Sequence, residues 1–406
     1  MPEPDSVPEP YGVREPDSVR EPDGVRVPDA LPVPLLDQHC HGVVAADLDD
    51  DAFGALLTES DRPPAPGTSP FDSALGLALR RWCPPALGLP AHADPAAYLA
   101  RRRSLGPAES TRRLLAAAGL RALLVDTGLT EASGQPLLPA DELASLAGAR
   151  VREVVRLENV AEALAARAPR AADWPAALRD ALAAALRKAD AVAVKSVLAY
   201  RHGLDIPADR VSDAEAVRAA AGFLAGPAGR LADPVLLRHL LWTAVDLCAR
   251  RALPLPLQLH TGFGDPDLTL HRADPSLLTP FIRAVEPTGV PLVLLHGYPY
   301  HRQVGWLAQV FPHVYADTGL TLSHTGPRAV TVLGELLELA PFGKVLFSTD
   351  AYGLPELYLV GAAQFRHALA TLLGDWQRAG ACAPADAAHL TRLLSFANAR
   401  RLYGLG

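Results

Sequence analysis

Short apolar segments alternate with longer amphipathic segments along most of the chain. The spacing of the longer segments, such as 161–187 and 235–252, is helical, and they are rich in Ala, Leu and Arg. We expect the short apolar segments to be strands, at 35–41, 121–127, 151–157, 191–197, 255–261, 291–296, 312–318 and 344–350. Strands that alternate with helices pair in parallel, and eight of them predict an α/β fold of the (β/α)8 TIM-barrel type. An open doubly wound sheet is the main alternative, but no glycine-rich GxGxxG turn follows the first strand.

The segment 43–120 is too long to be a single crossover helix. It contains GTSPFDSALGLALRRWCPPALGLP and a helix-like AAYLARRRSLG. We therefore expect a helical insertion after the first strand, placed over the barrel mouth as a lid that contributes substrate contacts.

The first 34 residues hold a degenerate repeat, VPEPYG, VREPDS, VREPDG and VRVPDA. Proline every few residues removes backbone donors, and the segment has too little apolar area to offset the entropy of ordering. We expect residues 1–34 to be a disordered tail and residues 35–406 to be the catalytic barrel.

Composition narrows the classes of function and partner. The chain is 49% hydrophobic with a formal charge of −7, so it can bury a large core, and neither nucleic acid nor a membrane surface is an expected partner. Its charge-free apolar stretches are shorter than the roughly 18 residues that a bilayer span needs. A small molecule is the expected substrate, and the oligomeric state is open, a homo-oligomer included.

The four cysteines are far apart and form no CxxC pair. This spacing argues against a disulfide framework or a cysteine zinc site, and it favours a reducing cytoplasm. The cysteines are Cys40, Cys83, Cys248 and Cys382.

Residues that can bind a metal stand at the C-terminal ends of five expected strands, the end at which barrels of this kind build active sites. They are His39, His41, Lys195, His260, His296 and Asp350. In a strand, His39 and His41 share one face while Cys40 points away, so both imidazoles can reach one ion. Imidazoles with a carboxylate suit zinc or a similar divalent metal, as one ion or two.

Several of these residues have alternative interpretations. His260 could be a hydrogen-bonded core histidine, and Asp350 could cap the following helix. His296 could bind a second metal or act as a base or electrophile beside the substrate.

Lys195 is one of three lysines in a chain that otherwise uses arginine, and it lies in the apolar strand AVAVKSV. A buried ammonium needs a partner or a modification. Two uses fit: carbamylation by carbon dioxide, which gives a carboxylate that bridges two metals, or a charge that orients substrate. Tyr200 and Arg201 follow at the same rim, where the Arg201 fork could bind a substrate carboxylate or form a salt bridge.

The motifs together resemble the amidohydrolase superfamily. They are DQHCHG, KSVLAYRHGL, LQLHTGFGD, LLHGYP, VYADTGL, LFSTDAYGLPELY and NARRLYGL, within residues 35–406. The run is most similar to the amidohydrolase-2 branch, in particular to amidohydrolase domains fused to, or encoded near, glutamine-synthetase-like enzymes (the fluG type). The Pro-rich N-terminus departs from that pattern, and the synthetase-like partner domain is missing.

The resemblance implies that His39, His41, His260 and Asp350 bind the first metal. It also implies that His296 binds a second metal or assists catalysis, that Lys195 is a bridging carbamate if two metals bind, and that Tyr200 and Arg201 face substrate. The leading hypothesis is a metal-dependent hydrolase of an amide such as a γ-glutamyl amide, with Asp350 as general base and acid and His296 stabilising the oxyanion. A nonoxidative decarboxylase and a noncatalytic metal-binding protein are the alternatives, because the fold alone does not fix the reaction.

Overall fold

The computed structural model describes residues 33–227 and 229–405. The tail predicted at 1–34 lies outside this range except for its last two residues.

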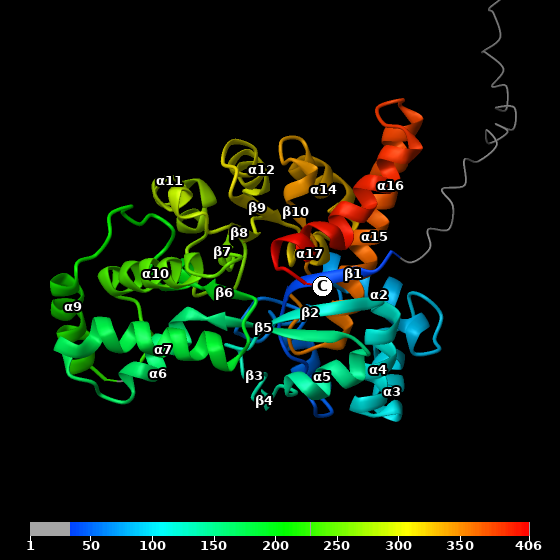
Figure 1. Cartoon of the computed structure of the whole chain (residues 1–406). Coiled ribbons are helices and arrows are strands. Elements are labelled where there is room, and N and C mark those ends of the chain that lie inside the picture. The colour runs from blue at the N-terminus through cyan, green and yellow to red at the C-terminus, as the bar shows by residue number, and fades with distance from the viewer. Residues whose placement is uncertain (1–32, 228, 406) are drawn as a thin grey trace, which may run out of the picture. The chain divides into compact units, whose positions relative to one another are not determined.

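Eight parallel strands form one sheet at the centre of the structure (Figure 1). Their order in the sheet is their order in the chain, with the β3–β4 hairpin left out. The strands are β1 Leu35–Cys40, β2 Leu120–Asp126, β5 Arg150–Arg156, β6 Ala193–Ser196, β7 Leu257–Thr261, β8 Leu292–His296, β9 Val314–Asp317 and β10 Val345–Leu346. Each overlaps a predicted strand, so the pattern of apolar segments located all eight.

Main-chain hydrogen bonds join the last strand to the first. The amide of Gln38 donates to the carbonyl of Phe347 (3.1 Å), and the amide of Asp350 donates to the carbonyl of His39 (3.0 Å). The amide of His41 then donates to the carbonyl of Ala351 (2.8 Å). The sheet is therefore a nearly closed barrel, and the predicted (β/α)8 TIM-type fold is confirmed.

Helices occupy the connections between the strands. Those between β2 and β10 are α5 Ala140–Ala147, α6 Leu157–Ala165, α7 Trp174–Lys188, α8 Leu198–Arg201, α9 Asp213–Ala225, α10 Pro234–Ala249, α11 Thr279–Val285, α12 His301–Val310, α13 Thr321–Thr325 and α14 Ala329–Leu337. A short hairpin, β3 Glu131–Ala132 and β4 Gln135–Pro136, precedes α5. After β10 come α15 Pro355–Arg378, α16 Pro384–Arg392 and α17 Asn398–Leu402. Short 3-10 segments lie at Ala171–Asp173, Leu270–Ala273, Pro275–Leu278, Glu286–Thr288, Gly326–Arg328 and Phe342–Lys344, and a π-helical turn at Leu393–Ala397.

The expected insertion after the first strand is helical. It contains α1 Asp50–Ala55, α2 Ala74–Ala86, α3 Pro95–Leu105 and α4 Pro107–Ala118. Helices α2 and α4 pack against α15, on the side of the barrel where β1 and β2 lie (Figure 1). The side chain of Arg102 in α3 donates to Glu356 of α15 (2.8 Å), and both groups are buried. The insertion is therefore an integral layer of the structure.

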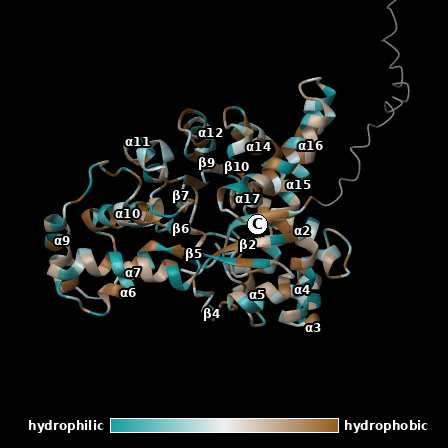
Figure 2. Cartoon of the chain, viewed as in Figure 1, coloured by the Kyte–Doolittle hydropathy of each residue, from teal (hydrophilic) through white to brown (hydrophobic). Residues whose placement is uncertain are grey.

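The barrel interior is apolar at one end and polar at the other. Helix α17 contributes Leu402 and Tyr403 follows it; both pack with Leu36, Leu124 and Leu346 from the strands. Figure 2 shows apolar strands surrounded by helices that carry both hydrophobic and hydrophilic faces. The polar residues gather at the carboxyl ends of the strands, above this apolar floor.

Two further expectations can be compared with the described residues. All four cysteines are free thiols. No helix in 33–227 or 229–405 combines the length and apolar character that a bilayer crossing requires.

Candidate metal centre

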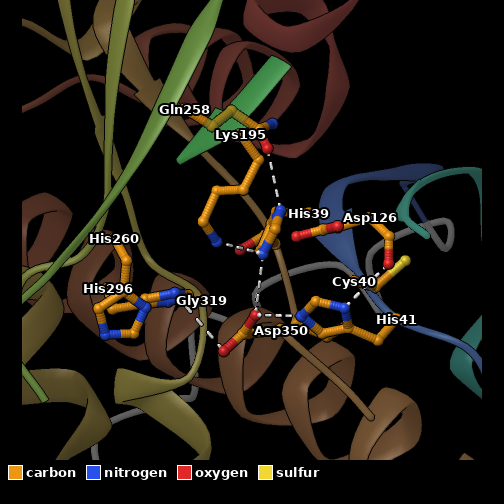
Figure 3. Close-up of polar contacts among 12 residues, drawn as sticks. His39, Cys40, His41, Asp126, Lys195, Gln258, His260, His296, Gly319 and Asp350 are labelled. Carbon is orange, nitrogen blue, oxygen red and sulfur yellow. Dashed lines mark hydrogen bonds and ion pairs between the residues drawn. The ribbon is translucent and has the colours of Figure 1, made fainter. Parts of the chain in front are cut away.

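Asp350 lies at the centre of a cluster of imidazoles (Figure 3). Its Oδ1 is 3.1 Å from Nε2 of His39 and 3.5 Å from Nε2 of His41, and its Oδ2 is 3.5 Å from Nε2 of His296. Donor atoms of His39, His296 and Asp350 all lie within 4.8 Å of one another. Three residues from the first, sixth and last barrel strands therefore offer ligand atoms to one point.

The tautomer of His39 follows from its neighbour Gln258. The side-chain nitrogen of Gln258 donates to the main-chain and side-chain oxygens of Gln38 and to the hydroxyl of Tyr403. Its Oε1 is thus the acceptor that faces Nδ1 of His39 at 2.9 Å. Because Nδ1 carries the proton, Nε2 of a neutral His39 presents a lone pair to Asp350.

His41 has the same arrangement with a different partner. Its Nδ1 lies 3.1 Å from the main-chain oxygen of Asp126, which can only accept, so Nδ1 donates. The remaining nitrogen, Nε2, then also presents a lone pair to Oδ1 of Asp350. The ring centroids of His39 and His41 are 5.2 Å apart, as expected for residues on one face of a strand.

These contacts test whether the residues fit a metal ion. Two imidazole lone pairs and a carboxylate oxygen that face one another favour a cation among them, and within the protein the ammonium of Lys195, 3.0 Å from Nε2 of His39, supplies part of that charge. Oδ1 of Asp350 accordingly has no hydrogen-bond donor although it is shielded from solvent. The donor set, neutral imidazole nitrogens and a carboxylate with second partners that fix the tautomers, suits a divalent metal such as zinc.

The pKa values agree with this protonation state. Burial lowers the pKa of His39 to about 4 and that of His296 to about 3. Burial alone would raise the pKa of Asp350, but the surrounding His296, His39 and His41 outweigh burial and hold it well below the usual value. At neutral pH, His39 and His296 are therefore neutral and Asp350 is ionised, so these groups carry no extra proton that a metal ion would have to displace.

His296 has two ring nitrogens without a hydrogen-bond partner, although the residue is only 2% exposed. Its Nδ1 is 3.9 Å from Oδ2 of Asp317, beyond hydrogen-bonding distance. A buried imidazole nitrogen without a hydrogen-bond partner destabilises the folded protein unless a ligand or an ion binds to it. His296 thus has one nitrogen directed at Asp350 and one available for a substrate or an ion.

His260 lies beside the cluster. Its ring centroid is 4.5 Å from that of His296 and 4.4 Å from that of Tyr200. Its Nε2 contacts the main-chain oxygen of Phe263 at 3.1 Å, which satisfies this nitrogen within the protein. The ligand role predicted for His260 stays a prediction.

Lys195 lies in β6 and reaches the same point from the other side. Its Nζ is 3.0 Å from Nε2 of His39, and the residue is 2% exposed. Burial lowers the pKa of its ammonium to about 8. A larger fraction of Lys195 is therefore the neutral amine than for a surface lysine, and the amine is the form that reacts with carbon dioxide.

Two of the site residues have backbone angles that side chains rarely adopt. His296 has φ of 67° and Asp350 has φ of 52°, both in the left-handed region. Each such residue costs about 1–3 kcal/mol, and such strain collects at functional sites. The conformation turns each side chain inward where its strand ends.

A buried polar network supports the cluster, and the sequence analysis did not assign its members. Gln38 donates to Oδ1 of Asp317 (2.8 Å), and Oδ2 of Asp317 accepts from the amide of His296 (3.1 Å). The β1–β2 register shifts between Asp37 and Cys40, so the neighbours Gln38 and His39 both contact Gln258. Asp317 ends strand β9, so the rule that selects polar residues at strand ends could have found it.

Asp126 was also missed, and it ends strand β2 in the same way. Its carboxylate forms a second group of neighbouring donor atoms with His39 and His41. However, Oδ2 accepts from Nη2 (2.7 Å) and Nε (3.0 Å) of Arg156, and Oδ1 accepts from the amide of Gly128. Asp126 is therefore paired with a cation within the protein, while Asp350 is not.

A cavity of about 370 Å³ opens above the cluster, and both predicted substrate residues line it. Arg201 pairs with Glu162 (3.1 Å), but its Nε and Nη1 are buried without partners. The Tyr200 hydroxyl lies so close to Gly264 that a Cβ there would be 2.0 Å from it. The cavity also contains Glu59, from an irregular part of the insertion where no periodic or strand-end signal marks it.

Comparison with known proteins gives a consistent result. The family model described as Amidohydrolase matches residues 89–405, which include Lys195, His260, His296 and Asp350. The chain is 29% identical to a protein of Lactobacillus casei provisionally described as a metal-dependent hydrolase, with a TM-score of 0.80 over 92% of this chain and 95% of that one.

Two further relatives define the extent of the similarity. Protein fluG of Emericella nidulans is 35% identical over 223 residues, which are 53% of this chain and 26% of the fungal protein. The chain thus matches about a quarter of the length of that relative. Glucuronate isomerase of Caulobacter crescentus is 17% identical with a TM-score of 0.62, covering 92% of this chain and 91% of that one, and it shares the fold.

Proposed function

The chain belongs to the amidohydrolase family, and we propose that it is a metal-dependent hydrolase that cleaves the amide C–N bond of a small substrate bearing a carboxylate. The observation that carries the proposal is the convergence of two imidazole lone pairs, from His39 and His41, on Oδ1 of Asp350. That arrangement is unfavourable for the protein alone and favourable around a divalent cation.

The chain's own residues supply the remaining parts of an amide hydrolysis. A bound divalent cation polarises a carbonyl and lowers the pKa of water. Asp350 is ionised and lies at the centre of the cluster, so it accepts the proton of the attacking water and passes it to the leaving nitrogen. His296 donates a hydrogen bond from its unpartnered ring to the oxyanion that develops on the carbonyl.

The proposed ligands are His39, His41, His260 and Asp350 for one ion, with zinc the metal that best suits the donor set. His296 and a carbamate on Lys195 would complete a second site. Lys195 supports this because it is buried, has a lowered pKa and lies 3.0 Å from His39. An unmodified Lys195 would instead serve as a charge that orients the substrate.

The position of Arg201 supports a substrate that bears a carboxylate. Two of its nitrogens, Nε and Nη1, are buried at the cavity wall without partners, and a substrate carboxylate can accept a hydrogen bond from one of them. A γ-glutamyl amide has such a carboxylate at one end and a cleavable amide at the other. Its size is compatible with a cavity of about 370 Å³.

The experiment that tests the proposal is purification without chelators, metal analysis and a substrate panel of γ-glutamyl amides and aromatic acids. We expect bound divalent metal and release of amine from the γ-glutamyl amides. Release of carbon dioxide from an aromatic acid, with no amine released from any amide, would replace hydrolysis by nonoxidative decarboxylation. Absence of stoichiometric metal and of both activities would leave a noncatalytic protein.

A further inference from the structure

A second cavity adjoins the one above the metal ligands. The inner cavity has a volume of about 370 Å³ and the outer one about 580 Å³. The two share Glu59 and Ser60 from the insertion and Asp265 and Pro266 from the segment after β7. Because they have these wall residues in common, the two cavities are neighbours on either side of Glu59.

The outer cavity has a different chemistry from the inner one. Its walls include apolar side chains from the insertion, Leu57 and Leu75, and others from the segment after β7, Phe263, Leu268 and Leu270. Leu270 is 44% exposed, an unusual state for a leucine on a concave wall. Exposed apolar surface in a cavity favours an apolar ligand, because its burial removes that surface from water.

Glu59 lines both cavities, and its Oε1 accepts no hydrogen bond from the protein. Its Oε1 is shielded from solvent without a hydrogen bond, and the nearest ion-pairing group is Nε2 of His324 at 3.5 Å. Burial lowers the pKa of His324 to about 4, so the imidazole is neutral at physiological pH. The ring of His324 in turn contacts that of Phe263, with centroids 5.2 Å apart. Burial, with the charges of Asp350 and Asp265, raises the pKa of Glu59 to about 8, so the group is mainly a neutral acid whose carbonyl oxygen can accept a hydrogen bond from a ligand N–H.

The charged groups of the inner cavity indicate how a substrate is oriented between Arg201 and Glu59. Burial lowers the pKa of Arg201, its salt-bridge partner Glu162 raises it, and the neighbouring charge of Arg230 lowers it. Glu59 has Asp350 and Asp265 as neighbours, and their charges, after burial, raise its pKa. The arginine side suits the carboxylate of the substrate. The Glu59 side is then left for the part of the substrate beyond the amide.

We propose that the outer cavity is a leaving-group subsite that takes an apolar alkyl or aryl substituent on the amide nitrogen, with Glu59 accepting a hydrogen bond from that nitrogen. This inference rests on the proposed amide hydrolysis and names the substrate class. Secondary amides of apolar amines are the substrates, and primary amides, which leave the outer cavity empty, are poor ones.

The kinetic test compares γ-glutamyl amides of ammonia, methylamine, butylamine and phenethylamine. We expect kcat/KM to rise with the apolar size of the amine, by about tenfold or more from methylamine to phenethylamine, the order of discrimination that apolar pockets provide. Leu270→Ser should lower kcat/KM for the phenethylamide severalfold more than for the methylamide. Leu339→Ser is the matched control, because Leu339 is 48% exposed and lines neither cavity.

Glu59 is tested by two substitutions. Glu59→Gln keeps an acceptor oxygen and should retain most of the activity on the phenethylamide, whereas Glu59→Ala should lose about tenfold or more. Equal activity of the two variants and the wild type would overturn the role of Glu59.

A binding measurement separates this inference from the proposed function. Calorimetry should detect phenethylamine binding to the protein, weaker binding to Leu270→Ser and unchanged binding to Leu339→Ser. If no amide is hydrolysed while these differences hold, the subsite stands and the hydrolysis proposal fails. If amides are hydrolysed with the same kcat/KM for every amine, and Leu270→Ser binds phenethylamine as the wild type does, the subsite is overturned.

Discussion

Nε2 of His39 lies 3.1 Å from Oδ1 of Asp350, and the proton of this imidazole is on the opposite nitrogen, which donates to Gln258. A lone pair thus faces a carboxylate inside the protein. The ammonium of Lys195, 3.0 Å from the same nitrogen, offsets part of the repulsion, and a divalent cation would offset it fully, so we interpret the contact as half of a metal site.

Asp350→Asn should abolish catalysis while the fold is retained. The amide side chain has nearly the same shape, but it cannot accept the water's proton, so kcat should fall by about 10²- to 10⁴-fold. The measurement is the rate of amine release at saturating zinc, with unfolding followed by circular dichroism. Asp246→Asn is the matched control, because Asp246 pairs with Arg210 at the surface. Unchanged kcat in Asp350→Asn would contradict the assignment of the base.

Gln258→Leu should weaken metal binding without touching a proposed ligand. Gln258 fixes the tautomer of His39 through a 2.9 Å hydrogen bond, and loss of such a partner costs about 10- to 100-fold in metal affinity. The affinity is measured by competition with a chromogenic chelator. Gln364→Leu is the control, because Gln364 is also buried but bonds to Trp82 and Gly326. An equal loss of affinity in both variants would point to general destabilisation instead.

Lys195 should carry a carbamate when the protein is loaded with metal. Protein equilibrated with ¹³C-bicarbonate and metal should show a carbamate resonance that is missing from Lys195→Ala and present in Lys188→Ala, since Lys188 is exposed. Lys195→Ala should also bind fewer ions, and a short carboxylic acid added to the buffer should restore part of the activity. A loaded wild-type protein without the resonance would leave Lys195 as an unmodified positioning charge.

Metal binding should displace no proton from His39 or His296 between about pH 5 and 7. In the folded protein burial lowers the pKa of His39 to about 4 and that of His296 to about 3, so neither imidazole carries a proton that an ion must displace in this range. Protonation of these two imidazoles should compete with binding only as the pH approaches these values. Calorimetry in buffers of different ionisation enthalpy measures the protons released. Release of one proton from each of these imidazoles at pH 5 to 6 would contradict the lowered pKa values.

The strands could be predicted because their apolar segments are short, rich in β-branched residues and separated by helical segments. The last strand shows the limit of this approach. The apolar segment 344–350 predicted a long strand, whereas β10 itself is Val345–Leu346 and the following residues bond to β1 as the barrel closes. The imidazoles and Asp350 could be located as polar residues at strand ends, and the closed barrel brings them together.

Other parts of the site depend on contacts that no local pattern encodes. Asp126 and Asp317 satisfy the strand-end rule, yet only the structure shows that one pairs with Arg156 and the other bonds to the amide of His296. Glu59 comes from an irregular part of the insertion, and its place at the cavity depends on how that segment folds over the barrel. The register shift in β1 likewise results from pairing with β2.

The most direct test is a crystal structure of protein loaded with cobalt or zinc, with anomalous data at the metal absorption edge. We predict an anomalous peak at about 2.0–2.2 Å from Nε2 of His39, Nε2 of His41 and a carboxylate oxygen of Asp350. Fully loaded protein with the peak elsewhere, or with these three atoms still in contact with one another and no ion among them, would contradict the account.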